Sequence, residues 1–506
     1  MLVIDINTQF GKRLDPDPAC APAALAEALA RHGVAAGATW SQQGLDYDSA
    51  AGNAETLDAC RQSGGRLLPC LVADPKDDPN LWEAELRRGR DAGVRLVRLF
   101  PAAHRWAIDS QLTRRLFARL REYGQVALVS SVDSPTGCEL PRPLAALAAQ
   151  AGVPLVLLDV YYGNMAECLA VLQEFPGVYA ETNWLATIGA VETAARAVGA
   201  GRLLYGSGAP GRSMQKALNQ VLEADLPHSD KALILGGNAL RLLGLSPDAF
   251  ASAPRLISTR PFTFSEPVID IHSHLGHFRM PGPREDYDPA PMLARMKAAG
   301  IALSVVSSYE SMRYDPASGN RRIAEAVRNR PALRGMIELD PLHVDRSLAE
   351  LARWSADPAF VACELELSHI PCPTASPNVR KLLEAAAKLR KPVLFMPASP
   401  GDVEAECALA RSLPDLVLVH AHGAEPDWAT AAAPVPNLYL EFCLSRANPL
   451  HFRECLDLLG PGRLLFGSDQ ILLSPLGQIG LYADVLRTPE ERAAVLNANA
   501  RRLYRL

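Results

Sequence analysis

The chain has 506 residues, of which 48% are hydrophobic and 21% charged, with a net charge of −5 and a pI near 6.2. This length exceeds one ordinary hydrophobic core and fits two domains of about 250 residues each. The weakly acidic balance excludes a basic surface for nucleic acid, and no run approaches the roughly 18 apolar residues of a membrane helix. We therefore expect a cytoplasmic protein without nucleic-acid or membrane partners. The ten cysteines have no regular spacing and are expected to be reduced.

The first half of the chain is repeated in the second half. The segment VIDINTQFG at residues 3–11 resembles VIDIHSHLG at residues 268–276. Near the end of each half, LYGSG at residues 204–208 resembles LFGSD at residues 465–469. Other pairs keep the same order, including VYAE at 178–181 with LYLE at 438–441. A period of about half the chain indicates a duplicated domain rather than a solenoid.

Short apolar runs alternate with helical patterns in each half, as expected for strands that are covered on both faces. In the second half we predict strands at residues 268–272, 303–307, 334–338, 361–366, 392–396, 416–420, 437–442 and 463–468. Helical patterns lie between them, for example from Val379 to Leu389 and from Glu404 to Ser412. A capping box of Thr488 and Glu491 marks the start of the last helix.

This order of elements predicts an α/β protein made of two tandem (β/α)8 barrels. A doubly wound open sheet is the alternative, but it usually has fewer strands and a glycine-rich phosphate turn. We place the first barrel at residues 1–247 and the second at residues 266–506. Residues 248–265 are predicted to be a moderately stiff linker, because they contain Pro254 and Pro261 and show no helical period.

Most of the histidines lie in the second half, and two of them form the motif His272-Ser273-His274. Side chains two residues apart in a strand point to the same side. At the carboxyl end of the first strand, both imidazoles would face the mouth of the barrel, where they could bind a divalent metal. The alternative is a pair of surface or capping histidines.

Asp469 follows the predicted eighth strand, which closes the barrel beside the first strand. It could bind the same metal or accept a proton from water there, and the alternative is an N-cap of the next segment. His420 ends the predicted sixth strand, and we favour it over His422 as the acid or base. A hydrogen-bonded structural histidine is the alternative.

The predicted fourth strand carries Glu364 and Glu366. A glutamate inside a barrel is unfavourable unless it binds a cation or another partner. We choose Glu366 as the metal ligand because it lies nearer the carboxyl end, while pairing with arginines is the alternative. His277 and Arg279 follow the histidine pair, and we expect them to line the mouth and bind substrate together with His422.

These motifs resemble the amidohydrolase superfamily, in particular the amidohydrolase-related branch that includes aminocarboxymuconate-semialdehyde decarboxylase. The resemblance rests on IDIHSH at 269–274, PDLVLVH at 414–420, RLLFGSD at 463–469 and NARRL at 499–503. It implies a barrel of the metal-dependent-hydrolase type, in which His272, His274 and Asp469 hold one divalent metal ion, usually zinc. Such proteins also have a fifth-strand histidine where this sequence has Met396, and a thioether is a poor zinc ligand.

The first half lacks the metal motif. Asn7, Gln9 and Gly208 stand opposite His272, His274 and Asp469. We align Asp159 with His420, and either Val129 or Ser130 with Met396. The first barrel is therefore expected to be a degenerate copy without a metal site.

We therefore expect a metal-dependent hydrolase or decarboxylase that acts through its second barrel on a small carboxylate- or amide-bearing molecule. The alternative is a non-catalytic pseudoenzyme that binds a metabolite or a protein partner. We also expect the two barrels to contact each other within the chain, and further oligomerisation is left open.

Overall fold

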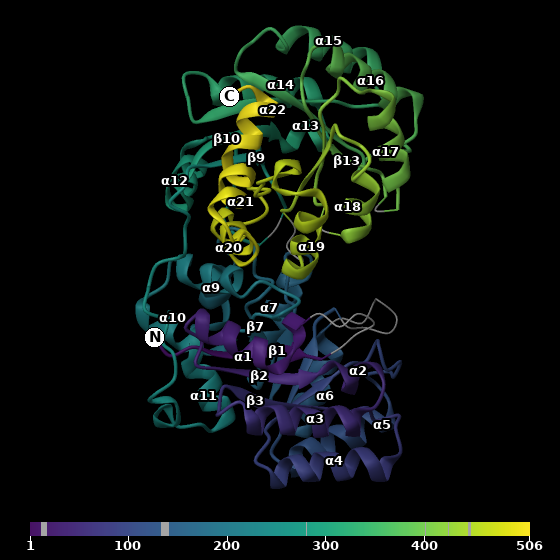
Figure 1. Cartoon of the computed structure of the whole chain (residues 1–506). Helices are drawn as coiled ribbons and strands as arrows, with labels where there is room; N and C mark the ends of the chain where they lie inside the picture. The colour runs from purple at the N-terminus through teal and green to yellow at the C-terminus, as the bar shows by residue number, and fades with distance from the viewer. Residues whose placement is uncertain (12–17, 133–140, 280, 400, 424, 444–446) are drawn as a thin grey trace. The chain divides into compact units, whose positions relative to one another are not determined.

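The computed structural model describes residues 1–11, 18–132, 141–279, 281–399, 401–423, 425–443 and 447–506. The chain forms two compact units, which comprise mainly Met1–Pro261 and, in the second unit, Phe262–Arg279 with Pro283–Leu506. Each unit contains one eight-stranded parallel sheet whose strands follow the order of the chain (Figure 1). The predicted fold class of two tandem (β/α)8 barrels is confirmed. The exact limits at 1–247, 248–265 and 266–506 stay predictions.

The first barrel is closed between its first and last strands. Ile6 N donates a hydrogen bond to Tyr205 O at 3.1 Å, and Gln9 N donates one to Ala209 O at 2.9 Å. Its strands are β1 (Ile4–Phe10), β2 (Ala36–Ser41), β3 (Leu67–Val72), β4 (Leu96–Leu99), β5 (Val126–Ser130), β6 (Leu155–Leu158), β7 (Val178–Glu181) and β8 (Leu203–Leu204).

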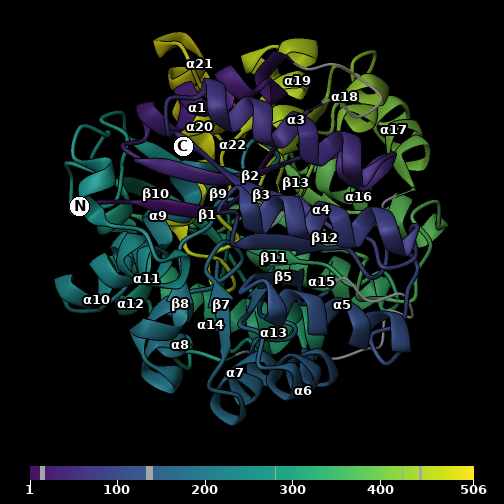
Figure 2. The same ribbon diagram turned by 90° about the horizontal axis from the view of Figure 1, so that it is seen from below.

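Helices surround the strands of this first barrel, as Figure 2 shows. Several of them begin at a capping side chain: Asp48 accepts from Ala51 N at the start of α3, and Ser213 accepts from Lys216 N at the start of α9. The helices are α1 (Pro22–Arg31), α2 (Gln42–Asp46), α3 (Ser49–Gln62), α4 (Pro79–Asp91), α5 (Gln111–Glu122), α6 (Pro141–Ala151), α7 (Met165–Glu174), α8 (Ala190–Val198), α9 (Met214–Glu223), α10 (His228–Ala232) and α11 (Asn238–Leu243).

The second barrel closes in the same way, because Ile271 N donates to Phe466 O at 3.0 Å and His274 N donates to Gln470 O at 2.7 Å. All eight predicted strands are present. The sixth begins two residues later than predicted, since Leu416 N donates to Leu413 O in the turn that follows a helix. The strands are β9 (Val268–Leu275), β10 (Ile301–Ser308), β11 (Leu333–Glu338), β12 (Phe360–Glu366), β13 (Val393–Met396), β14 (Leu418–His420), β15 (Leu438–Glu441) and β16 (Leu464–Leu465).

The helices of the second barrel agree with the sequence pattern. The capping box of Thr488 and Glu491 is formed at the start of α21. None of the helices in the described ranges of the chain is both long and apolar enough to cross a membrane. The helices are α12 (Ala290–Ala299), α13 (Tyr309–Arg313), α14 (Pro316–Val327), α15 (Val344–Trp354), α16 (Pro377–Lys388), α17 (Val403–Ser412), α18 (Pro426–Ala432), α19 (Pro449–Leu459), α20 (Pro475–Val485), α21 (Pro489–Ala493) and α22 (Asn499–Tyr504).

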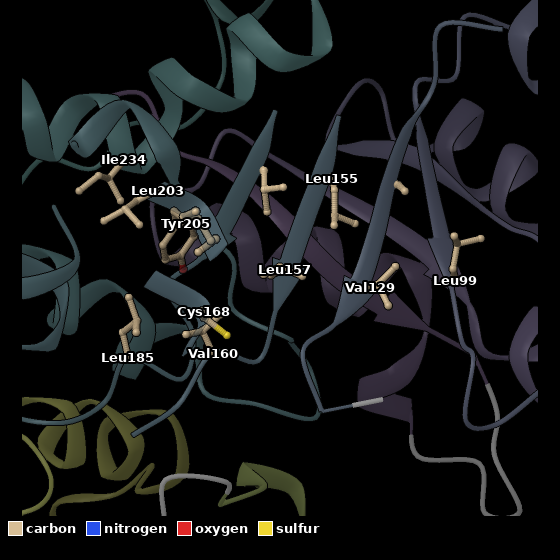
Figure 3. Close-up of a cluster of buried hydrophobic side chains, with 14 of the residues drawn as sticks. Leu99, Val129, Leu155, Leu157, Val160, Cys168, Leu185, Leu203, Tyr205 and Ile234 are labelled. Atoms are coloured by element: carbon tan, nitrogen blue, oxygen red, sulfur yellow. The ribbon is translucent and has the colours of Figure 1, made fainter. Parts of the chain in front are cut away.

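Strand side chains alternate between two apolar layers. In the first barrel, Val129, Leu155 and Leu157 pack between the strands and the helices (Figure 3). Leu128 and Val156, which alternate with them, belong to the cluster inside the barrel. The second barrel repeats this division, so the residue number along a strand decides which side chains reach the barrel interior.

In each barrel, a buried asparagine of the last helix forms hydrogen bonds with the last strand. Asn238 Nδ2 donates to Leu203 O at 2.7 Å, and Asn499 Nδ2 donates to Leu464 O at 2.8 Å. Asn499 Nδ2 also donates to Pro461 O at 2.7 Å. The same tie therefore occurs at equivalent places in both barrels.

Replacement of this asparagine tests its contribution to stability. Asn499→Ala should lower the free energy of unfolding by about 1–3 kcal/mol, because it leaves buried carbonyl groups without a donor. Asn497→Ala, which removes an exposed hydrogen bond to Pro267 O, is the matched control and should cost under about 0.5 kcal/mol. Urea unfolding measures both variants, and equal losses would contradict the proposed tie.

Candidate metal centre

A β-bulge turns the two histidines of β9 into the second barrel. Between its pairing with Ser304 and its pairing with Val306, β9 contains one residue more than β10. Ile271 packs inside the barrel, so regular alternation would send the next residue outward. The extra residue shifts the alternation, and both His272 and His274 lie among the carboxylates at the carboxyl ends of the strands.

His272, His274 and Asp469 converge at this end of the barrel. The Nε2 atoms of the two histidines are 3.1 Å apart, and His274 Nε2 is 3.3 Å from Asp469 Oδ1. All three side chains are buried. Ligands with bonds of about 2.0–2.1 Å to one cation lie about 2.9–3.4 Å apart, so these atoms already have suitable spacing.

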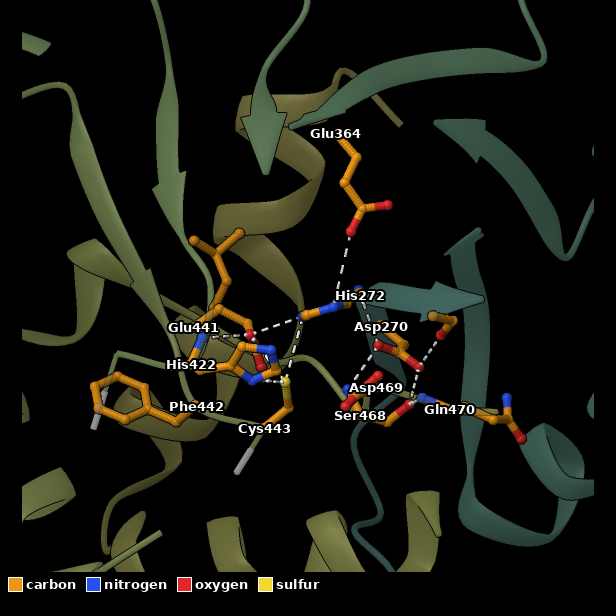
Figure 4. Close-up of polar contacts among 12 residues, drawn as sticks. Asp270, His272, Glu364, His422, Glu441, Phe442, Cys443, Ser468, Asp469 and Gln470 are labelled. Atoms are coloured by element: carbon orange, nitrogen blue, oxygen red, sulfur yellow. Dashed lines mark hydrogen bonds and ion pairs between the residues drawn. The ribbon is translucent and has the colours of Figure 1, made fainter. Parts of the chain in front are cut away.

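Buried backbone contacts hold this arrangement in place. Asp270 is completely buried and accepts hydrogen bonds from His272 N at 3.1 Å and from Ser468 N at 3.0 Å (Figure 4). Asp469 N donates to His272 O at 2.8 Å. These bonds join the end of β9 to the turn after β16, and they place Asp469 beside the histidines.

Both glutamates of β12 face inward. Ala362 belongs to the interior cluster and Leu365 to the outer one, so Glu364 and Glu366 point to the interior at successive levels. Glu364 is 3.9 Å from His272 Nε2 and 3.9 Å from His274 Nδ1. Glu366 Oε1 instead accepts a hydrogen bond from Ser368 N at 2.7 Å. Glu364 is therefore the glutamate of this strand that lies beside both histidines.

Two further buried glutamates border the site. Glu338 pairs directly with Glu364 in the sheet, and its carboxylate is buried beside that of Glu364. Burial, followed by repulsion from Glu364, raises the pKa of Glu338 well above its ordinary value. On β15, Glu441 Oε2 lies 3.0 Å from His272 Nδ1 and orients that ring.

The charge balance of the site favours a cation. Burial by itself lowers the pKa of His272, but attraction to Glu441, Asp469 and Glu364 outweighs burial and raises it to about 10. The carboxylates thus hold a proton, and with it a positive charge, on this ring. A divalent ion would satisfy the same negative charge. The donor set of two imidazoles and neighbouring carboxylates therefore fits a metal ion.

His420 lies on the helix side of β14. Its neighbours Val419 and Ala421 belong to the interior cluster, which points His420 outward. His420 Nδ1 is 2.8 Å from Glu406 Oε2 of α17, and the ring stacks on Trp428 of α18 at 3.7 Å. The structure therefore does not bring His420 together with the three converging residues.

His422 reaches the site instead. Its backbone has φ 62°, a left-handed conformation that departs from the strand, and its ring centre lies 5.1 Å from that of His272. Burial, with nearby His272, lowers the pKa of His422 to about 4. His422 Nδ1 is 3.1 Å from Cys443 Sγ. Cys443 and Glu441 were not among the site residues predicted from the sequence, although the repeated tetrapeptides VYAE and LYLE contain the glutamate at equivalent positions.

The remaining candidates lie at the rim. His277 and Arg279 are exposed in the segment after β9. Met396 ends β13 beside Glu366 and packs against the interior cluster, so it occupies an inward position at the mouth. The thioether therefore stands inside the barrel where a fifth-strand ligand would project.

The strand registers align the first barrel with this site. Asp159 has φ 58° and its N donates to Glu181, just as His422 N donates to Glu441, so Asp159 corresponds to His422. The alignment of Asp159 with His420 was therefore wrong by two residues, and the position of Met396 is taken by Ser130. The same registers give the first-barrel residue at each position of the site. These pairs are Asn7 for His272, Gln9 for His274, Val72 for Glu338, Arg98 for Glu364, Asp159 for His422, Glu181 for Glu441 and Gly208 for Asp469.

Comparisons with known proteins agree with this duplicated barrel. The profile of the amidohydrolase family matches residues 4–245 and again residues 269–506. An uncharacterized metal-dependent hydrolase of Mycobacterium tuberculosis, TatD, is 26% identical over 268 residues, which cover 47% of this chain and 98% of that protein.

Similar solved structures include a 2,6-dihydroxybenzoate decarboxylase from Rhizobium, which is 16% identical with a TM-score of 0.40 over 47% of this chain and 99% of its own. An uncharacterized TIM-barrel protein from Bordetella bronchiseptica is 18% identical with a TM-score of 0.39 over 47% of this chain and 98% of its own. Since the family profile covers both halves, this chain belongs to the amidohydrolase family and carries two copies of its barrel.

Proposed function

We propose that the protein is a metal-dependent hydrolase or decarboxylase whose catalytic site lies in the second barrel. The observation that carries this proposal is the convergence of His272, His274 and Asp469 within cation-binding distance of one another. The similarity to a protein named as a metal-dependent hydrolase supports it. Zinc suits two imidazoles and a carboxylate, and we propose it as the ion.

The residues around the site would divide the work. A divalent ion there supplies Lewis-acid polarisation of a substrate oxygen and makes water more acidic. Asp469, whose Oδ1 contacts His274, would accept a proton from water during hydrolysis. Glu441 holds the orientation of His272 through Nδ1. Exposed His277 and Arg279 at the rim would bind the carboxylate or amide of a small substrate.

The proton-transfer role predicted for His420 has a second candidate in His422. His422 lies beside His272 and stays neutral at pH 7, because its pKa is lowered to about 4. His420 is instead paired with buried Glu406. We propose that His422 takes part in proton transfer and that His420 positions the end of β14.

The first barrel would be a non-catalytic partner of the second. Its positions offer amides at Asn7 and Gln9, no side chain at Gly208, and the cation Arg98 in place of Glu364. These groups do not form the donor set of a divalent metal. Contact between the barrels, further oligomerisation and a cytoplasmic location stay predictions.

Metal content tests the proposed function. The purified protein should retain at least one divalent ion per chain, and His272→Ala/His274→Ala should lose it, because two nitrogen ligands are removed. The control His343→Ala/His451→Ala removes two histidines away from the site, whose side chains are 56% and 41% exposed, and should keep the metal. Elemental mass spectrometry measures all three proteins. Equally low metal in wild type and the first variant would favour the non-catalytic alternative, a pseudoenzyme that binds a metabolite or a protein.

A pair of glutamine variants tests which glutamate supports the ion. Glu364→Gln should weaken zinc affinity by about 10–100-fold, because Glu364 lies beside both histidines. Glu366→Gln, which changes a glutamate already bonded to Ser368 N, should leave the affinity nearly unchanged. Competition with a fluorescent chelator measures both affinities. A larger effect of Glu366→Gln would support the choice of Glu366 made from the sequence.

The free energy of unfolding of two variants tests the different roles of His420, at the end of β14, and His422, in the turn after it. His420→Ala should lower the free energy of unfolding by about 3 kcal/mol, because it leaves buried Glu406 without its partner. His422→Ala should cost less, since His422 is only partly buried and its Nδ1 faces the thiol of Cys443 instead of a buried carboxylate on a helix. Urea unfolding at pH 7 compares the two, and a greater loss in His422→Ala would contradict these assignments.

A further inference from the structure

Four donor atoms surround a second point beside His272. Cys443 Sγ lies 3.3 Å from His272 Nδ1, 3.1 Å from His422 Nδ1 and 3.1 Å from Glu441 Oε2. All four donors lie within 4.8 Å of one another (Figure 4). They come from the ends of β9 and β15 and from the turn after β14.

Of the two barrels, the second has this set of four donors and the first does not. Glu181 occupies the place of Glu441 in the first barrel, so the carboxylate is common to both. The thiol is replaced there by Asn183, whose buried Nδ2 has no hydrogen-bond partner among the described residues, and Asp159 takes the place of His422. The second barrel, which has the converging histidines, therefore has both the thiol and the imidazole. The first barrel has neither group at the equivalent positions.

We propose that Cys443, His422 and Glu441, with His272 Nδ1 at the fourth corner, form a second cation-binding position that contains a thiolate. In a tetrahedral site with a sulfur bond of about 2.3 Å and nitrogen bonds of about 2.0–2.1 Å, the sulfur and nitrogen atoms lie about 3.5 Å apart. The two sulfur–nitrogen pairs, now 3.3 and 3.1 Å apart, therefore need to separate by only a few tenths of an ångström. Sulfur and imidazole ligands select zinc, cobalt or cadmium over magnesium or calcium.

The position lies on the other edge of the His272 ring from the proposed centre and shares that ring with it. His272 Nε2 faces His274, whereas Nδ1 faces Cys443. Binding of a cation at the new position releases the Cys443 thiol proton to solvent. His272 would offer Nε2 to the first position and Nδ1 to the second. This inference rests on the proposed function only through the shared histidine.

Cobalt(II) provides a direct probe of the thiolate. The metal-stripped full chain, titrated with cobalt(II), should develop a sulfur-to-cobalt charge-transfer band in the near ultraviolet. Cys443→Ser should lose the band and keep about one cobalt, held by the other position. Cys455→Ser removes a buried cysteine of α19 and should keep the band. His274→Ala/Asp469→Asn should keep the band, because it removes only the first position.

Absence of the band in cobalt-saturated wild type, or its persistence in Cys443→Ser, would overturn the proposal. A wild type with the band and a Cys443→Ser protein that binds no cobalt would instead reject the centre formed with His274 and Asp469. Should Cys443→Ser fail to fold, X-ray absorption of the zinc-loaded wild type decides. A sulfur shell at about 2.3 Å supports the proposal, and nitrogen and oxygen neighbours alone overturn it.

Discussion

Negative charge buried inside the second barrel is the constraint on which its site depends. Five carboxylates gather at the carboxyl ends of its strands: Glu338, Glu364, Glu366, Glu441 and Asp469. Their charge is unfavourable in a buried space unless protons or a cation compensate it. The raised pKa values of His272 and Glu338 show two ways in which protons do so. A divalent ion would compensate the same charge and release those protons.

The first barrel has the same framework with fewer buried carboxylates among its described residues. Asp5 bonds to Ser207 N as Asp270 bonds to Ser468 N, so the link between the first strand and the last turn is retained. Where the second barrel has Glu364, the first has Arg98, which donates to backbone carbonyls and lies over the ring of Phe100. The contact between the first strand and the last turn is therefore kept in both barrels, although the charged side chains at the mouth differ.

Periodicity predicted the strands well, because apolar runs identify buried parallel strands whatever their chemistry. Periodicity could not predict whether each site residue points into the barrel or toward the helices. The bulge in β9 reverses the alternation before His272, and the left-handed residue His422 departs from the strand that points His420 outward. Both depend on local backbone geometry that hydrophobic patterns do not record. The spacing of two places Glu364 and Glu366 on the same side of β12, but that this side is the interior, and which glutamate lies beside the histidines, required the structure.

The glutamate at the end of the seventh strand links scaffold and chemistry in both barrels. Glu181 Oε1 accepts from the amide of Asn7, whereas Glu441 Oε2 faces the ring of His272. In each barrel a glycine follows the eighth strand where any Cβ would lie within 2.5 Å of this carboxylate, so the close approach itself is retained. A histidine can therefore be exchanged for an asparagine at this place without disturbing the strands. It follows that loss of the metal ligands in one copy is compatible with an intact barrel.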